Sequence, residues 1–178
     1  MRKEAIQRVA LVFSLLDANG NGVLDEEDFT LMGDRVVAAA PPIALQAKER
    51  LRAAFALYWT TLRDELDADG DGVVSFEEYQ ACVLSPERFS ATVTEFAEAL
   101  AALGDPDGDG LIERPVFVAL MTAIGFALPN IHALFDAFEP DQDDRVEVRT
   151  WVEAIKDYYA PDKAGIADHL VPDATPAA

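Results

Sequence analysis

Residues 67–78 place oxygen-bearing side chains at every second position and again at the end of a short acidic segment. A hard cation of the size of Ca²⁺ takes six to eight oxygens at roughly 2.3–2.6 Å, from carboxylates, a backbone carbonyl and water. Positions 1, 3, 5, 7 and 12 of such a ligand pattern are here Asp67, Asp69, Asp71, Val73 (through its carbonyl) and Glu78. The segment is therefore predicted to bind Ca²⁺.

Two other residues complete this segment. Gly72 at position 6 allows the positive φ that a sharp turn around a cation needs. Ser75 at position 9 is placed to hold a ligating water. The alternative interpretation is a surface turn that is merely rich in Asp and Gly. A match at every ligand position favours the metal site.

The same pattern recurs three more times along the chain. With residues 67–78 as loop two, loop one is 17–28, loop three is 105–116 and loop four is 139–150. Such self-similarity indicates one structural unit that is used four times. The loops differ in how many ligand positions they keep, so the sequence predicts sites of unequal strength.

Loop one keeps an oxygen at every ligand position but ends in a shorter side chain. Its candidate ligands are Asp17, Asn19, Asn21, Val23 (through its carbonyl), Asp25 and Asp28. Asp28 stands where loop two has Glu78 and is one methylene shorter. A shorter arm favours one ligating oxygen over two, and a coordination number near six suits Mg²⁺. Loop one is therefore predicted to bind Ca²⁺ and Mg²⁺ in competition.

Loop three lacks the closing carboxylate. It offers the side chains of Asp105, Asp107 and Asp109 and the carbonyl of Leu111. Val116, which cannot bind a metal, occupies position 12. Glu113 at position 9 is a candidate to contribute an oxygen directly, so we expect weak binding.

Loop four departs further from the pattern. It has Glu139, Asp141 and Asp143, but Asp144 replaces the turn glycine and Thr150 replaces the closing glutamate. Asp tolerates a left-handed backbone better than most residues, so the turn is expected to survive. We expect loop four to be a structural partner of loop three rather than a metal site.

Two positions outside the ligand set repeat as well. Position 8 is β-prone or aliphatic in all four loops: Leu24, Val74, Ile112 and Val146. Such residues can face each other across a short antiparallel bridge that couples two loops. The residue after each loop is always aromatic: Phe29, Tyr79, Phe117 and Trp151. We expect these rings to anchor the helices that follow the loops.

Apolar residues at helical spacing precede every loop. They are Ile6, Val9, Phe13 and Leu16; Leu51, Phe55, Tyr58, Trp59 and Leu62; Phe96 and Leu100; and Ile131, Leu134, Phe135 and Phe138. The pattern predicts core-facing helices and an all-α fold of four helix–loop–helix units.

Turn-forming residues separate these units at Pro41-Pro42, 85–87 and 125–130. We expect a compact molecule of two paired lobes. The predicted divisions are residues 1–85 with loops one and two, residues 86–160 with loops three and four, and a C-terminal tail at 161–178 with a short helix at 164–171.

Composition excludes several functions. The formal net charge is −19, from 33 acidic and 14 basic side chains, and the basic residues are scattered singly. Nucleic-acid binding needs clustered Lys and Arg. Cys82 is the only cysteine, so no disulfide can form within the chain, and we expect it to be a core residue. With no apolar run long enough for a bilayer and no cleavage site after the basic N-terminus, the prediction is a cytoplasmic monomer.

In these loops and their flanking helices the chain resembles the EF-hand superfamily, and in length, spacing and tail it is similar to calerythrin and the sarcoplasmic calcium-binding proteins. The resemblance covers residues 1–160 and implies an intracellular Ca²⁺ and Mg²⁺ binder. Members of that family commonly keep three working sites, often with intact third and fourth loops. This sequence weakens both, so the usual occupancy does not carry over. Dockerin-like modules use similar loops but lack full entering helices.

Two functional classes follow. A buffer only binds calcium, whereas a sensor exposes an apolar surface to a target protein. Adaptable target grooves are rich in methionine, and this chain has only Met1, Met32 and Met121. The sequence therefore favours a buffer, with a sensor as the alternative. Enzymatic activity is not expected, because His132 and His169 are the only histidines and no catalytic motif is visible.

Overall fold

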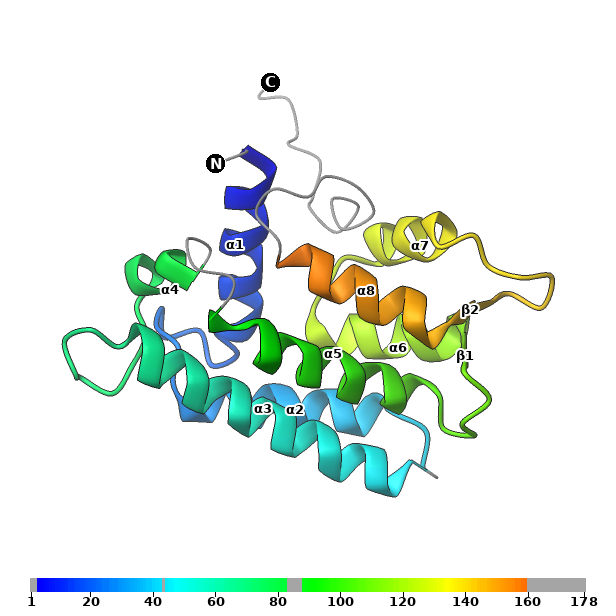
Figure 1. Cartoon of the computed structure of the whole chain (residues 1–178), viewed down its shortest axis with the longest axis horizontal. Coiled ribbons are helices and arrows are strands. Elements are labelled where there is room, and N and C mark those ends of the chain that lie inside the picture. The colour runs from blue at the N-terminus through cyan, green and yellow to red at the C-terminus, as the bar shows by residue number, and fades with distance from the viewer. Residues whose placement is uncertain (1–2, 43, 83–87, 160–178) are drawn as a thin grey trace.

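The computed structural model describes residues 3–42, 44–82 and 88–159 (Figure 1). The elements along these residues are α1 (Lys3–Leu16), α2 (Glu26–Ala39), α3 (Leu45–Leu66), α4 (Phe76–Cys82), α5 (Ser90–Gly104), β1 (Leu111–Glu113), α6 (Arg114–Ile124), α7 (Leu128–Ala137), β2 (Arg145–Glu147) and α8 (Val148–Tyr158). Each predicted loop lies between two helices, so the all-α fold of four helix–loop–helix units is confirmed.

Four predictions fall outside what the structure describes. They are the turn at 85–87, the tail at 161–178 with its helix and His169, and the burial of the Ile6 and Cys82 side chains. His132, in contrast, lies on α7 as a half-buried boundary residue, as expected.

One predicted boundary is wrong by a turn. The sequence assigned 125–130 to a connection, but α7 already begins at Leu128. Pro129 lies in its first turn, where a missing N–H breaks no hydrogen bond. The connection is therefore only 125–127. Gly125 ends α6 with φ +116, a left-handed conformation that suits glycine.

The loops pair through their position-8 residues, as predicted. Leu24 and Val74 form an isolated antiparallel bridge between loops one and two. In the other pair, β1 and β2 run antiparallel and Ile112 lies opposite Val146. All four side chains are buried, so each bridge is also part of the core.

The two loop pairs lie at opposite ends of the molecule, with the loop between α3 and α4 at one end and β1 and β2 at the other (Figure 1). Helices α3 and α5 pack against each other between these ends. Phe55 and Phe96 meet edge to face with ring centroids 5.2 Å apart, and Arg50 Nε lies 2.9 Å from Glu95. The buried apolar residues of both halves form one continuous cluster, so the halves share a core.

The predicted anchors are in this core. The aromatic residues that follow the loops are all almost fully buried: Phe29, Tyr79, Phe117 and Trp151. The apolar residues that precede loops two to four are buried too, as are Phe13 and Leu16 before loop one, whereas Val9 is half-buried. No helix among the described residues has the length and apolar character needed to cross a membrane.

Candidate metal centre

Loop two gathers its first three carboxylates into one compact set. One oxygen each from Asp67, Asp69 and Asp71 lies within 4.8 Å of the others. Two oxygens that bind one Ca²⁺ at roughly 2.3–2.6 Å can be no farther apart than twice that distance, so the spacing fits a single ion. Asp67 also organises the turn, since its Oδ1 accepts the Gly70 amide at 2.7 Å and its Oδ2 accepts the Gly72 amide at 3.0 Å.

Loop one repeats this arrangement with amides in place of two carboxylates. Asp17 accepts the backbone amides of Asn21 and Gly22, each at 3.0 Å. The side-chain NH₂ group of Asn21 donates to Asp25 at 3.0 Å and that of Asn19 donates to Glu27 at 3.3 Å. These bonds assign the oxygen of each amide, because the side-chain nitrogen already donates to a neighbouring carboxylate.

The residues predicted to bind metal through their carbonyls are held in place by the side chain at position 5 of their loop. Each donates its amide to the position-5 side chain, at 3.0 Å for Val23, 3.0 Å for Val73 and 2.8 Å for Leu111. The left-handed glycines just before them turn the chain, with φ +89 at Gly22 and +87 at Gly72. Positions 5 to 7 are therefore built alike in loops one to three.

The closing side chain of loop two ties the two ends of the loop together. Glu78 Oε1 accepts the Ala68 amide at 3.0 Å, and Oε2 accepts the Ser75 amide at 2.9 Å. The Ser75 hydroxyl also donates to Oε2, at 2.8 Å, and accepts the Glu78 amide at 3.3 Å. Ser75 and Glu78 thus form a capping box for α4. The Ser75 hydroxyl, which we expected to hold a water, also takes part in this box.

Asp28 does the same for loop one with its shorter arm. Its Oδ1 accepts the Asn19 amide at 3.0 Å and its Oδ2 accepts the Asp25 amide at 2.9 Å. Asp25 in turn accepts the Asp28 amide at 3.3 Å, which completes a capping box at the start of α2. The position-12 carboxylate therefore has a second role in both loops, because it also fixes the first turn of the exiting helix.

The two closing carboxylates differ in burial and in the direction of their pKa shifts. Asp28 is 0% exposed, and this desolvation raises its pKa above the ordinary value although two backbone amides oppose the shift. The amide and hydroxyl of Ser75 and the amide of Ala68 lower the pKa of Glu78. The charge of Asp28 is thus the costlier one, and a cation beside it would offset that cost.

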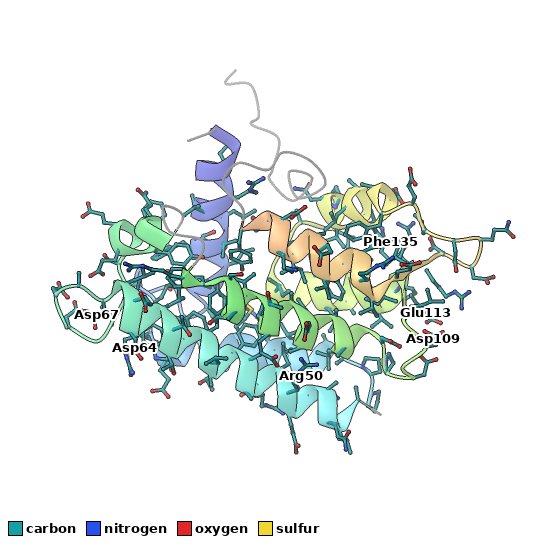
Figure 2. The ribbon with its side chains drawn as sticks, viewed as in Figure 1. Arg50, Asp64, Asp67, Asp109, Glu113 and Phe135 are labelled. Atoms are coloured by element: carbon teal, nitrogen blue, oxygen red, sulfur yellow. The ribbon has the colours of Figure 1, made fainter. Side chains whose placement is uncertain are left out.

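Loop three has only the first half of this architecture. Asp105, Asp107 and Asp109 again bring three carboxylate oxygens within 4.8 Å of one another, and Figure 2 shows Asp109 far from Asp67. Glu113 is exposed and lies outside that set among the described residues. It precedes α6 without a side-chain cap, and Val116 packs against the core.

Loop four is built differently from loops one to three. Glu139 and Asp144 take left-handed φ values of +55 and +62, so the expected tolerance of Asp at the glycine position is confirmed. Asp141 and Asp143, at positions 3 and 5, are both paired with Arg145. As in loop three, the helix that follows begins without a side-chain cap.

Two arginines that the sequence reasoning missed thus belong to the C-terminal pair. Arg145 stands at position 7 of loop four, and Arg114 at position 10 of loop three reaches Asp144 at 2.7 Å. The available signal was charge within the loops, since loops one and two contain no Lys or Arg.

Comparison with known proteins points to one family. A family model described as EF hand matches residues 9–32 and 64–84, the segments that contain the whole of loop one and of loop two. A probable calcium-binding protein of Oryza sativa subsp. japonica is 27% identical over 128 residues, which are 63% of this chain and 70% of that protein.

Solved structures show the same fold. A calcium-binding protein of Streptomyces coelicolor superposes with a TM-score of 0.72 and 24% identity, over 89% of this chain and 99% of that chain. A sarcoplasmic calcium-binding protein from amphioxus superposes with a TM-score of 0.71 and 17% identity, over 96% and 97%. These likenesses confirm the EF-hand fold, and with it the predicted resemblance to sarcoplasmic calcium-binding proteins.

Proposed function

We propose that this EF-hand protein binds Ca²⁺ firmly through loops one and two and weakly through loop three. The observation that carries the proposal is the closing carboxylate. Asp28 and Glu78 each join the start of a loop to the start of its exiting helix. Position 12 is Val116 in loop three and Thr150 in loop four. Without a carboxylate at position 12, a bound ion has fewer oxygen ligands, and no side chain there joins the start of the loop to the start of the exiting helix.

The proposed ligands follow the order of the loops. They are Asp17, Asn19, Asn21, Val23 and Asp28 in loop one; Asp67, Asp69, Asp71, Val73 and Glu78 in loop two; and Asp105, Asp107, Asp109 and Leu111 in loop three. The bound ion would supply positive charge at the centre of each loop. The side chains bind it, and the glycine turns hold them in register.

Loop one is proposed to admit Mg²⁺ as well. The closing residue of this loop, Asp28, is one methylene shorter than Glu78 and is fully buried, whereas Glu78 is only partly buried. Mg²⁺ requires a smaller, near-octahedral shell of ligands. Its affinity relative to Ca²⁺ therefore rises where the closing residue offers one oxygen instead of two. All three calcium-binding loops of a structural neighbour, the ctenophore photoprotein berovin, bind magnesium ions; it superposes at 15% identity and a TM-score of 0.65.

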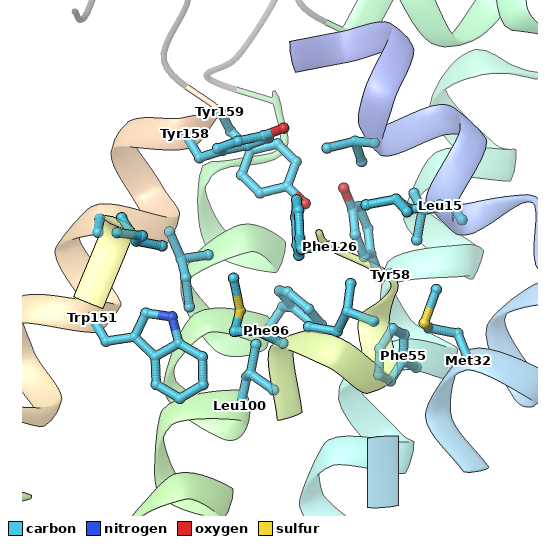
Figure 3. Close-up of a pocket in the computed structure, with 17 residues that line it drawn as sticks. Leu15, Met32, Phe55, Tyr58, Phe96, Leu100, Phe126, Trp151, Tyr158 and Tyr159 are labelled. Carbon is cyan, nitrogen blue, oxygen red and sulfur yellow. The ribbon is translucent and has the colours of Figure 1, made fainter. Parts of the chain in front are cut away.

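A buffer is the role that the interior supports. An apolar cavity of about 70 Å³ lies where the two halves meet, and residues of both halves line it (Figure 3). Met32 and Met121 are among its walls and are 1% and 3% exposed. Methionines that could adapt to a target are thus committed to the core.

A sensor is the alternative, because the Streptomyces coelicolor neighbour is described in connection with calcium-mediated regulation. Titration calorimetry of the metal-free protein, paired with an apolar fluorescent dye, separates the roles. The buffer role requires two firm sites per chain and little change in dye emission when calcium is added. A strong calcium-dependent rise in emission would identify a sensor, and a chain without firm sites would contradict both.

A further inference from the structure

Loop four contains a guanidinium between carboxylates that match ligand positions of the other loops. Arg145 Nε donates to Asp141 at 3.2 Å, and its Nη2 donates to Asp143 at 3.1 Å. The matching residues of loop two are Asp69 and Asp71, whose carboxylates converge with no cationic side chain in the loop. In loop four a positive charge is therefore built into the chain.

The backbone of loop four is arranged around this pair. Asp141 Oδ1 accepts the amides of Asp143 and Arg145 at 2.9 and 3.0 Å. In loops one to three the amide of position 7 donates to the side chain at position 5 instead, and the residue at position 1 accepts the amides of positions 5 and 6. The Asp144 amide closes a tight turn on the Asp141 carbonyl at 3.0 Å, and the Asp141 amide reaches the Arg145 carbonyl at 2.9 Å.

A second guanidinium joins this turn to loop three. Arg114, the first residue of α6, binds both carboxylate oxygens of Asp144, at 2.7 and 2.8 Å. It also donates to Asp136 on α7 at 2.7 Å, and its guanidinium carbon lies 4.3 Å from the centre of the Phe135 ring. Two-point binding to one carboxylate is stronger and more directional than a single charged contact.

We propose that Arg145, supported by Arg114, replaces the metal ion as the counter-charge of loop four, so that the C-terminal loop pair keeps its β-bridge without calcium. The four carboxylates that these arginines bind belong to α7 and loop four: Asp136, Asp141, Asp143 and Asp144. Without the guanidinium groups, Asp141, Asp143 and Asp144 would repel one another within a single turn.

This arrangement gives the two halves unlike responses to calcium. In the N-terminal pair the acidic side chains have no cation within their loops, so closure gains from metal. In the C-terminal pair the strands stay paired, and the buried Ile112 and Val146 keep their places in the core. The C-terminal pair, whose β-bridge does not require calcium, then serves as the rigid base on which the N-terminal pair responds.

Amide hydrogen exchange of the full chain in excess chelator tests the proposal. Two amides that flank the β1–β2 pair report on it: Val148 donates to Gly110 at 3.0 Å and Arg114 donates to Asp144 at 3.3 Å. In the wild type we expect both to remain protected in chelator, while the Leu24 and Val74 amides lose roughly tenfold or more of their calcium-loaded protection. Loss of protection at Val148 equal to that at Val74 would overturn the proposal.

Charge-matched variants identify the residue responsible. Arg145→Met should speed exchange at Val148 roughly fivefold in chelator, the upper range for a partly exposed ion pair, and Arg145→Lys should restore part of the protection. Arg149→Met is the control, because Arg149 is 84% exposed and pairs only at 3.3 Å with Glu147. It should change exchange by less than about twofold. Equal effects of the two Met variants, with circular dichroism showing both folded, would assign the effect to net charge and contradict a special role for Arg145. The two Met variants are compared in chelator, without calcium. The result therefore does not depend on whether the proposed calcium sites are correct.

Discussion

Leu24 and Val74 exchange both of their backbone hydrogen bonds, each amide lying 2.9 Å from the other residue's carbonyl oxygen. Both side chains are 0% exposed. The bridge therefore joins loop one to loop two at position 8, one residue after the carbonyl that is predicted to bind metal in each loop. We therefore expect a change in the shape of one loop to affect the other through these two bonds.

Glu78→Gln tests this coupling. Glutamine keeps the shape of the side chain but has only one acceptor oxygen and no charge, so loop two should lose its firm site. The affinity of loop one should fall about fivefold or more, the lower range for coupled sites. Calorimetric calcium titration measures both effects, and Glu77→Gln, at the exposed neighbouring residue, is the control. A variant that retains all firm sites would refute the assignment of loop two.

Asp28→Glu should shift loop one towards calcium. The longer arm can offer two oxygens, which raises the coordination number and disfavours Mg²⁺. Calcium titrations with and without saturating Mg²⁺ should show strong competition at loop one in the wild type and less in the variant. If Mg²⁺ leaves the calcium affinity of the wild-type loop unchanged, the proposal that the short Asp28 side chain admits Mg²⁺ is wrong.

Glu113→Gln should abolish the weak binding at loop three. Glu113 is the one carboxylate in the second half of that loop, and its exposed side chain is available to move towards an ion. Titration at high calcium should lose the weak phase. Glu147→Gln, the exposed residue at the same position of loop four, should leave that phase intact. An unchanged isotherm for the first variant would show that Glu113 does not bind the metal.

Acid should weaken the C-terminal pair through Asp144. The bidentate hydrogen bonds from Arg114 lower the pKa of Asp144 below its ordinary value of 3.8. A carboxyl whose pKa is lower in the folded state contributes stability above its unfolded pKa and loses it as the pH falls through the folded value. Urea unfolding of metal-free protein should show this loss below about pH 4, and Asp144→Asn should reduce it. Identical pH dependence in variant and wild type would contradict the pairing.

The repeat in the sequence predicted much of the fold. Position 8 and the aromatic residue after each loop depend on local spacing, so Leu24 and Phe29 could be placed before the structure was known. The packing of α3 on α5 and the reach of Arg114 to Asp144 join residues far apart in the chain, which spacing does not encode. The sequence shows the positive charge of Arg145 but not that its guanidinium lies between Asp141 and Asp143, because the side-chain conformation depends on the folded loop.

Three glycine amides provide the most direct test of where calcium binds. Gly22, Gly72 and Gly110 each donate to the position-1 carboxylate of their own loop, at 3.0, 3.0 and 2.9 Å. A cation on that carboxylate changes its charge distribution and therefore the shift of the amide proton. In an NMR calcium titration, Gly22 and Gly72 should reach their final shifts by two equivalents, before Gly110 responds. A shift of Gly110 that is complete first, or together with the other two, would contradict firm binding in the N-terminal pair.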